Sequence, residues 1–122
     1  MYTYKAKLEK VVDGDTIDVN IDLGFDVSIK KRVRFAGINA PESRTRDLEE
    51  KARGLAAKDR VKAIFAENPS FTLESKELGK YGRVLGELYV DKLDGTDQIT
   101  QINVNKQLIK EGHAVEYHGG KR

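Results

Sequence analysis

The sequence feature that most restricts the fold is a strict alternation of apolar and polar residues in the first third of the chain. Every second residue from 17 to 23 is apolar, and the residues between are Asp18, Asn20 and Asp22. Successive side chains of a strand point to opposite faces, so this pattern predicts a strand with one buried face. Similar patterns predict further strands at residues 2–12, 27–35, 71–73 and 84–90. Lys31 breaks the alternation of the 27–35 stretch, which suggests a β-bulge there.

Two helices are expected between and after these strands. The first has an apolar stripe at helical spacing, formed by Ala57, Val61, Ile64 and Phe65. We expect it to begin near Gly54, because residues 43–53 are highly charged and indicate a loop or a frayed start, and to end at Asn68-Pro69. The second is a short helix that packs Leu108 and Ile109 inward, with Asn103 or Asn105 as its cap. Gly112 ends it and residues 113–122 form a short tail.

The predicted order is three strands, a helix, two strands and a helix. This order by itself supports an α+β protein, mainly β, with a sheet of about five strands. Five short antiparallel strands with a helix after the third suggest a small five-stranded OB-fold barrel with flanking helices. The length of 122 residues indicates one domain, which we assign to residues 1–118, with 119–122 as a short tail.

Composition excludes several classes of protein. The chain contains no cysteine, so it has neither disulfides nor thiolate chemistry. No apolar run approaches the length of a membrane span, and the N-terminus lacks the apolar segment of a signal peptide. We therefore expect no membrane association and a cytoplasmic location, unless the chain is a mature fragment. The net charge of +2 does not by itself indicate nucleic-acid binding, although Lys30, Lys31, Arg32 and Arg34 form a basic cluster.

Polar residues that could take part in catalysis or metal binding follow the strand that ends near residue 35. Arg34 alternates with Val33 and Phe35 and therefore points to the opposite face. Gly37 and Pro41 oppose further pairing, so the chain leaves the sheet on a loop held by a rigid strand. That loop carries an amide oxygen, a backbone carbonyl and a carboxylate, from Asn39, Ala40 and Glu42.

Two other segments offer complementary groups. Asp13-Gly14-Asp15 reads as a polar turn between strands, but its carboxylates also suit a hard cation. It is not an EF-hand, because its glycine is at the second loop position and Gly24 occupies the twelfth. Arg83 alone reads as a cation at a hairpin turn. Arginine forks bind phosphate oxygens, and a metal with a general base would complete a phosphoryl-transfer site.

Other catalytic motifs are absent from the sequence. Lys80 follows Gly79 without the earlier glycine of a P-loop. His113 and His118 have no partners at zinc-binding spacing, and there is no G-x-S-x-G elbow.

The conjunction of motifs resembles the thermonuclease (staphylococcal or micrococcal nuclease-like) family. The matching segments, in order, are Val12–Thr16, Arg34–Glu42, Lys80–Arg83 and Leu108–Ala114. The resemblance extends from about Tyr4 to Tyr117. It implies an OB barrel with flanking helices and calcium-dependent hydrolysis of phosphodiester bonds in DNA and RNA, leaving 3′-phosphates.

The resemblance also implies roles for individual residues. Asp15, Asn39 and the Ala40 carbonyl would hold Ca²⁺, with Asp13 behind Asp15 in a supporting position. Glu42 would be the general base on the attacking water. The other implied residues hold the scissile phosphate (Arg34 and Arg83) or line the nucleotide groove (Lys80, Tyr81 and Tyr117). The expected partner is single-stranded DNA or RNA, and the expected state is a monomer.

Two departures from the family pattern leave alternatives open. Asn39 stands where the family usually has a second metal-binding carboxylate, so we expect weaker calcium binding or a changed preference among divalent cations. The sequence also ends before the long C-terminal helix of the family, as in a short form. One alternative is a non-catalytic OB-fold module that binds single-stranded nucleic acid. Another is a protein-interaction domain with a vestigial site.

Overall fold

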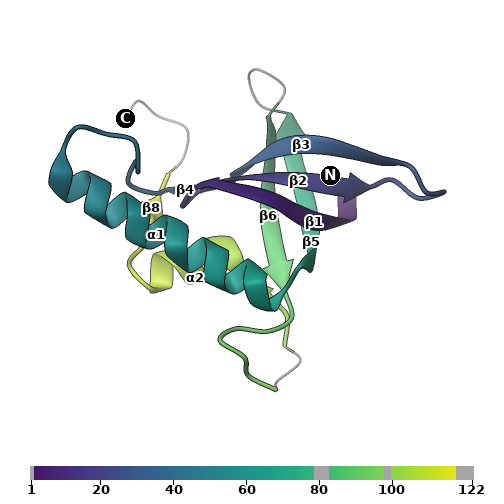
Figure 1. Ribbon diagram of the computed structural model, residues 1–122. Coiled ribbons are helices and arrows are strands. Elements are labelled where there is room, and N and C mark those ends of the chain that lie inside the picture. Colours follow the sequence, from purple (N-terminus) through teal and green to yellow (C-terminus); the bar gives the residue numbers. More distant parts are fainter. Residues whose placement is uncertain (1, 79–82, 98–99, 118–122) are drawn as a thin grey trace.

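A computed structural model describes residues 2–78, 83–97 and 100–117. In the described residues the chain forms a β-barrel flanked by helices (Figure 1). The elements in order are β1 (Tyr2–Asp13), β2 (Thr16–Asp22), β3 (Ser28–Phe35), β4 (Ile38–Asn39), α1 (Leu48–Glu67), β5 (Ser70–Leu78), β6 (Val84–Val90), β7 (Ile102–Asn103), α2 (Val104–Lys110) and β8 (Val115–Glu116). Among the helices of these residues, none has the length and apolarity that crossing a membrane requires.

The barrel is closed by one parallel strand pair. Antiparallel pairing joins neighbours in the order β3-β2-β1-β5-β6, and β7 adds to the outer edge of β6. A parallel pairing of β3 with β6, which aligns Val33 with Val84 and Arg34 with Leu85, joins the two ends. This is the five-stranded OB-fold architecture that the sequence predicted, and the predicted fold class is confirmed.

The predicted apolar stripe of α1 packs against the barrel. Ala57, Val61, Ile64 and Phe65 are all buried, as helical spacing required. The ring of Phe65 lies 4.6 Å, centroid to centroid, from that of Phe71 on β5. Asn68 ends the helix, and its side-chain amide donates to the Ile64 carbonyl at 3.0 Å. Helix and sheet thus share one core.

The predicted start of this helix was wrong. The helix begins at Leu48, six residues before Gly54, and Asp47 is its N-cap. The Asp47 carboxylate accepts hydrogen bonds from the backbone N–H groups of Glu49 and Glu50, at 3.0 and 3.2 Å. The first turns show no apolar stripe because they extend past the core, and Leu48 is 79% exposed. Capping and helix propensity, not burial, form this end.

The bulge suggested at Lys31 is also absent. Pairing of β2 with β3 runs from Thr16–Arg34 to Asp22–Ser28 without a shift. Irregular pairing occurs instead in β1, next to Leu8 and Val11, and in β5, next to Ser75. Residues 28–30 are exposed, and the β2–β3 hairpin projects from the molecule (Figure 1). A strand that leaves the core has no buried face, so alternation is not required of it.

The C-terminal segment resolves one alternative and corrects another expectation. Asn103 is the cap of α2, because its side chain accepts from the Lys106 N–H at 3.1 Å. Gly112, at φ +80°, ends the helix in a Schellman motif. Residues 113–117 are not simply a tail, since β8 pairs with β4. Strands of two residues carry no alternation that a sequence could reveal. Residues 118–122 lie outside the described part of the chain.

Candidate active site

Three separate segments bring polar side chains together at the ends of β2, β3 and β4. Asp15 directly precedes β2, Arg34 lies near the end of β3, and Asn39 is in β4. Arg34 Nη1 lies 3.5 Å from Asp15 Oδ2, and Arg34 Nη2 donates to Asn39 Oδ1 at 3.2 Å. The same Asp15 Oδ2 accepts from the Ala40 N–H at 2.9 Å. We call Asp15, Arg34, Asn39 and Ala40 the acid–arginine cluster.

Strand pairing forces this arrangement. Thr16 is paired with Arg34, and the Phe35 N–H donates to the Asp15 carbonyl at 2.8 Å. The Thr16 hydroxyl donates to Asp15 Oδ1 at 3.0 Å, so both carboxylate oxygens are engaged. Asp15 is only 7% exposed. A nearly buried carboxylate needs such partners, and here they also fix its direction toward Arg34.

Asp13 holds the loop that carries Glu42. Its Oδ1 accepts from the Ser43 backbone N–H at 3.3 Å and from the Ser43 hydroxyl. Asp13 thus supports the neighbouring loop, a position compatible with its predicted supporting place. Ser43 is buried, and nothing in the sequence marks it as part of the site. A lone serine in a charged loop carries no signal of this kind.

Two glycines let the helix approach the site closely. A Cβ on Gly14 would lie 2.6 Å from the Ala57 Cβ of α1. A Cβ on Gly54 would lie 2.4 Å from the Glu42 carbonyl oxygen and 2.7 Å from the Ser43 nitrogen. Both approaches are too short for any side chain. The turn before β2 and the 42–43 loop are therefore packed against one helix face.

Glu42 and Arg83 are placed less tightly. Glu42 follows the cluster by two residues, and its side chain is exposed. Arg83 is exposed one residue before β6, whose Leu85 pairs with Arg34. Within the described residues, Arg83 makes none of the contacts that hold the cluster together. The predicted groove residues Lys80 and Tyr81 lie outside the described residues.

Tyr117, the third predicted groove residue, lies beside Arg34. Its backbone N–H donates to the Gly37 carbonyl at 2.9 Å, next to the β4–β8 pair. The Arg34 guanidinium carbon is 5.9 Å from the centre of the Tyr117 ring, within cation–π range. The structure thus brings Tyr117 to the cluster from a segment about 80 residues away from Arg34 in sequence.

Asn105 supports the turn that follows Arg34. Its place at the start of the short helix predicted only a capping role, but Asn105 is buried and bonded to the barrel. Its Nδ2 donates to the carbonyls of Ala36 and Gly86 at 2.8 and 3.1 Å, and its Oδ1 accepts from the Leu88 N–H at 3.2 Å. Asn105 precedes Leu108 and Ile109 by three and four residues, and an asparagine on that apolar helix face was the available sign of such a role.

The oxygen atoms of the cluster suit a hard cation in type. Carboxylate, amide and backbone carbonyl oxygens are the ligands of Ca²⁺, and Asp15, Asn39 and Ala40 supply one of each. Asp15 Oδ2 and Asn39 Oδ1 both face one guanidinium, so they already converge on a positive group. In the described residues no three His, Cys, Asp or Glu side chains gather as a metal site. These oxygen atoms therefore fit a hard cation, and Asp15 supplies the one negative charge among them.

A closed five-strand barrel with this polar cluster at the ends of its strands defines an OB-fold protein of the α+β class. A family model described as "Staphylococcal nuclease homologue" matches residues 32–122. The chain therefore belongs to the family of staphylococcal nuclease homologues, and the resemblance seen in the sequence is confirmed.

Two characterised relatives match over nearly the whole chain. Micrococcal nuclease of Shigella flexneri is 32% identical over 114 residues, which are 93% of this chain and 59% of that protein. Protein ParB of Escherichia coli is 30% identical over 117 residues, which are 94% of this chain and 59% of that protein. The chain thus spans about three fifths of the length of these relatives.

Proposed function

We propose that this protein is a divalent-metal-dependent nuclease that hydrolyses phosphodiester bonds of single-stranded DNA or RNA. The observation that carries the proposal is the convergence of Asp15, Arg34 and Asn39 from three segments of a barrel. Membership in the nuclease-homologue family and the likeness to a micrococcal nuclease support it. We propose that the protein acts as a monomer, because the cluster is assembled within one chain.

The roles of the chain's own residues follow from their chemistry. Arg34 presents a planar fork that can hold two oxygens of the scissile phosphate, and Arg83 adds a second cation. Glu42 takes the proton of the attacking water, for which its exposed carboxylate is accessible. Water adds to phosphorus as the bond to the 5′ oxygen breaks, which leaves a 3′-phosphate and a 5′-hydroxyl.

The same proposal assigns the metal-binding residues. Asp15, Asn39 and the Ala40 carbonyl would hold Ca²⁺ or another hard divalent cation. The bound ion would supply positive charge that stabilises the charge developing on the phosphate. Asp13 would keep the 42–43 loop in position through Ser43.

The decisive test compares Glu42→Gln with wild type in a cleavage assay. A labelled single-stranded DNA is incubated at mildly alkaline pH with calcium and, separately, with chelator. We expect calcium-dependent cutting by wild type and a loss of at least about 10²-fold in the variant, because a general base contributes that much. The matched control is Glu49→Gln, which removes the charge of an exposed carboxylate on α1. This variant should cut normally.

Normal turnover of a folded Glu42→Gln variant would remove Glu42 from the proposed role. A wild-type protein that is folded, binds the strand and cuts nothing with calcium, magnesium or manganese would contradict the nuclease itself. That result would favour a non-catalytic OB-fold module that binds single-stranded nucleic acid. The feature that favours this second function is Asn39, which leaves Asp15 as the sole carboxylate of the cluster.

A further inference from the structure

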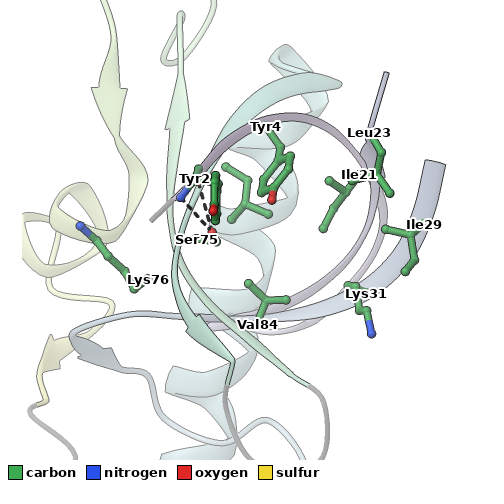
Figure 2. A pocket seen from close by; sticks show the side chains of 10 residues that line it. Tyr2, Tyr4, Ile21, Leu23, Ile29, Lys31, Ser75, Lys76 and Val84 are labelled. Carbon is green, nitrogen blue, oxygen red and sulfur yellow. Dashed lines mark hydrogen bonds between the residues drawn. The ribbon is translucent and has the colours of Figure 1, made fainter. Parts of the chain in front are cut away.

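A second concave surface lies at one end of the barrel, apart from the acid–arginine cluster (Figure 2). It encloses about 440 Å³, within the range of small-ligand sites. The strands β1, β2, β3, β5 and β6 contribute to its wall. The residues that matter for its chemistry are Tyr2, Tyr4, Leu23, Ile29, Lys31 and Val84. We call this surface the barrel pocket.

The barrel pocket exposes aromatic and aliphatic surface. Tyr2 is 69% exposed, Leu23 is 47% exposed and Ile29 is 39% exposed. The rings of Tyr2 and Tyr4 lie 6.4 Å apart and are tilted by 44° (Figure 2). Exposed aromatic faces on a concave wall offer a stacking surface for a flat ligand, and every nucleic-acid base has such a face.

One lysine of the barrel pocket can provide charge for an anionic ligand. Lys31 makes no ion pair with any other described residue. Lys76 also lines the pocket, but its ammonium lies 2.6 Å from a Glu74 oxygen and 3.2 Å from a Glu87 oxygen. The flat apolar wall together with Lys31 therefore suits a ligand that has both an aromatic ring and a phosphate.

The barrel pocket and the proposed cleavage site share strands but lie on opposite faces of β3, since alternation puts Lys31 on the face of Val33 and Arg34 on the other. Lys31 precedes Arg34 by three residues of β3, which is roughly 10 Å of extended chain. Val84 lines the pocket and directly follows Arg83. β3 and β6 run parallel, with Val33 aligned to Val84. A polymer held at the two arginines therefore reaches the pocket only if it is long enough to bend around the strands, which a dinucleotide is not.

We propose that the barrel pocket is a second subsite that binds one base of single-stranded DNA or RNA, packed against Tyr2 and Tyr4, with a flanking phosphate on Lys31. The inference rests on the proposed function and extends it to substrate length. The basic segment 30–32 opposes a second copy as the occupant, because self-association would bring like charges together. A polyanion has the complementary charge.

The test measures how the effect of pocket variants depends on substrate length. The variants are Tyr2→Ala and Lys31→Ala, and the probes are an oligothymidylate of about 12 nucleotides, within the usual range for an OB fold, and thymidylate dinucleotide. For the long probe we expect KM and Kd to rise about 5- to 10-fold, the low end of base stacking on an aromatic residue. KM and Kd for the dinucleotide, and kcat for both probes, should equal those of the wild type.

A matched control separates the pocket from general charge. Lys62 is exposed on α1 and does not line the pocket, so Lys62→Ala removes the same charge outside the pocket. Binding of the long probe, followed by fluorescence anisotropy in chelator, should show a log–log salt slope that is shallower by about 0.7 for Lys31→Ala. Lys62→Ala should leave both the slope and the affinity near wild type.

Several results would overturn the inference. These are equal affinity of both pocket variants and wild type, equal losses for long and short probes, or a concentration-dependent dimer that Tyr2→Ala abolishes. The last result would assign the pocket to a second copy. A failure of the proposed nuclease function gives a different result from a failure of the pocket inference. In that case the wild type does not cut the substrate, whatever the variants bind.

Discussion

At the scale of the residue, Arg34 connects the parts of the candidate site. Its guanidinium lies against Asp15, donates to Asn39 and faces the ring of Tyr117. Its neighbours Val33 and Phe35 are fully buried, so the strand cannot turn without exposing them. The backbone of the barrel core therefore determines where the guanidinium points, and the cluster has a rigid support.

Asn39 is the residue most open to a direct test of metal binding. We expect Asn39→Asp to tighten Ca²⁺ binding about 10-fold, because calcium affinity depends on the charge of the ligands. Isothermal titration calorimetry measures this without nucleic acid. Asn20→Asp adds the same charge on β2 and should change calcium affinity little. Unchanged affinity in Asn39→Asp would exclude Asn39 from the metal-binding residues.

Gly54 tests the close approach of α1 to the site loop. In an exposed helix, replacing Gly with Ala usually stabilises by about 1 kcal/mol. Here the added Cβ meets the Glu42 carbonyl at 2.4 Å, so we expect Gly54→Ala to lower the free energy of unfolding by about 1–3 kcal/mol. Displacing Glu42 should also reduce turnover on the order of 10- to 100-fold. Denaturant unfolding and the cleavage assay measure the two effects.

Gly24 provides the comparison for Gly54. It lies at the β2–β3 hairpin with φ +84° and open space around it. Gly24→Ala should therefore cost about 1 kcal/mol of stability through backbone strain, with turnover unchanged. If Gly54→Ala behaved like Gly24→Ala, or like wild type, the contact between α1 and the 42–43 loop would not position Glu42.

At the scale of the element, Arg60 ties α1 to α2 and to the loop after β6. Its guanidinium donates to both Glu111 oxygens, at 2.6 and 2.8 Å, and to both Asp94 oxygens, at 2.6 and 3.2 Å. Glu111 is the residue at which α2 ends. The bond to Arg60 lowers the pKa of Glu111 below its ordinary value, although partial burial opposes that change.

This network predicts an acid-sensitive part of the stability. A carboxylate with a lowered pKa in the folded state stabilises the fold above its unfolded pKa, near 4.3, and loses that effect as pH falls through the folded pKa. We expect Arg60→Ala to lower the free energy of unfolding by about 1–2 kcal/mol at pH 7, as hydrogen bonds to charged groups do. Urea titrations should show this difference shrinking below about pH 4.5.

Lys62→Ala is the control for the loss of a positive charge on α1. Lys62 is exposed, and its removal should change stability by less than about 0.5 kcal/mol at every pH. A difference between Arg60→Ala and wild type that stayed constant down to pH 2 would show that Arg60 acts through packing and not through Glu111.

Sequence patterns predicted the helices and strands in which buried residues recur at a regular spacing. The stripe of α1, the strand 84–90 and the alternation of β2 were all visible, because each has one face in the core. The first turns of α1 and the outer half of β3 lie beyond the core, so their polar residues misled the interpretation. The β4–β8 pair was missed because two residues show no period.

At the scale of the whole molecule, closure of the barrel creates the candidate site. The parallel pair of β3 with β6 places the segment after Arg83 beside the strand that carries Arg34, about 50 residues away in sequence. The turn before β2 and the end of β4 meet at the same end of the barrel, through the bond from the Ala40 N–H to Asp15. The site is a product of topology as much as of motifs.

The mainly β fold, the helix stripe and the family could be predicted from the residues alone, and so could the set Asp15, Arg34, Asn39 and Ala40 that the structure brings together. Alternation, helical spacing and ordered motifs depend on residues that are close together in the sequence, so they can be recognised without a structure. The structure was needed to find that Asp13 accepts a hydrogen bond from Ser43 and that Gly54 packs against the loop of Glu42. It was also needed to find that Tyr117 faces Arg34 and that a pocket lies beside Tyr2. Each of these depends on the approach of segments far apart in sequence, and closure of the barrel sets that approach.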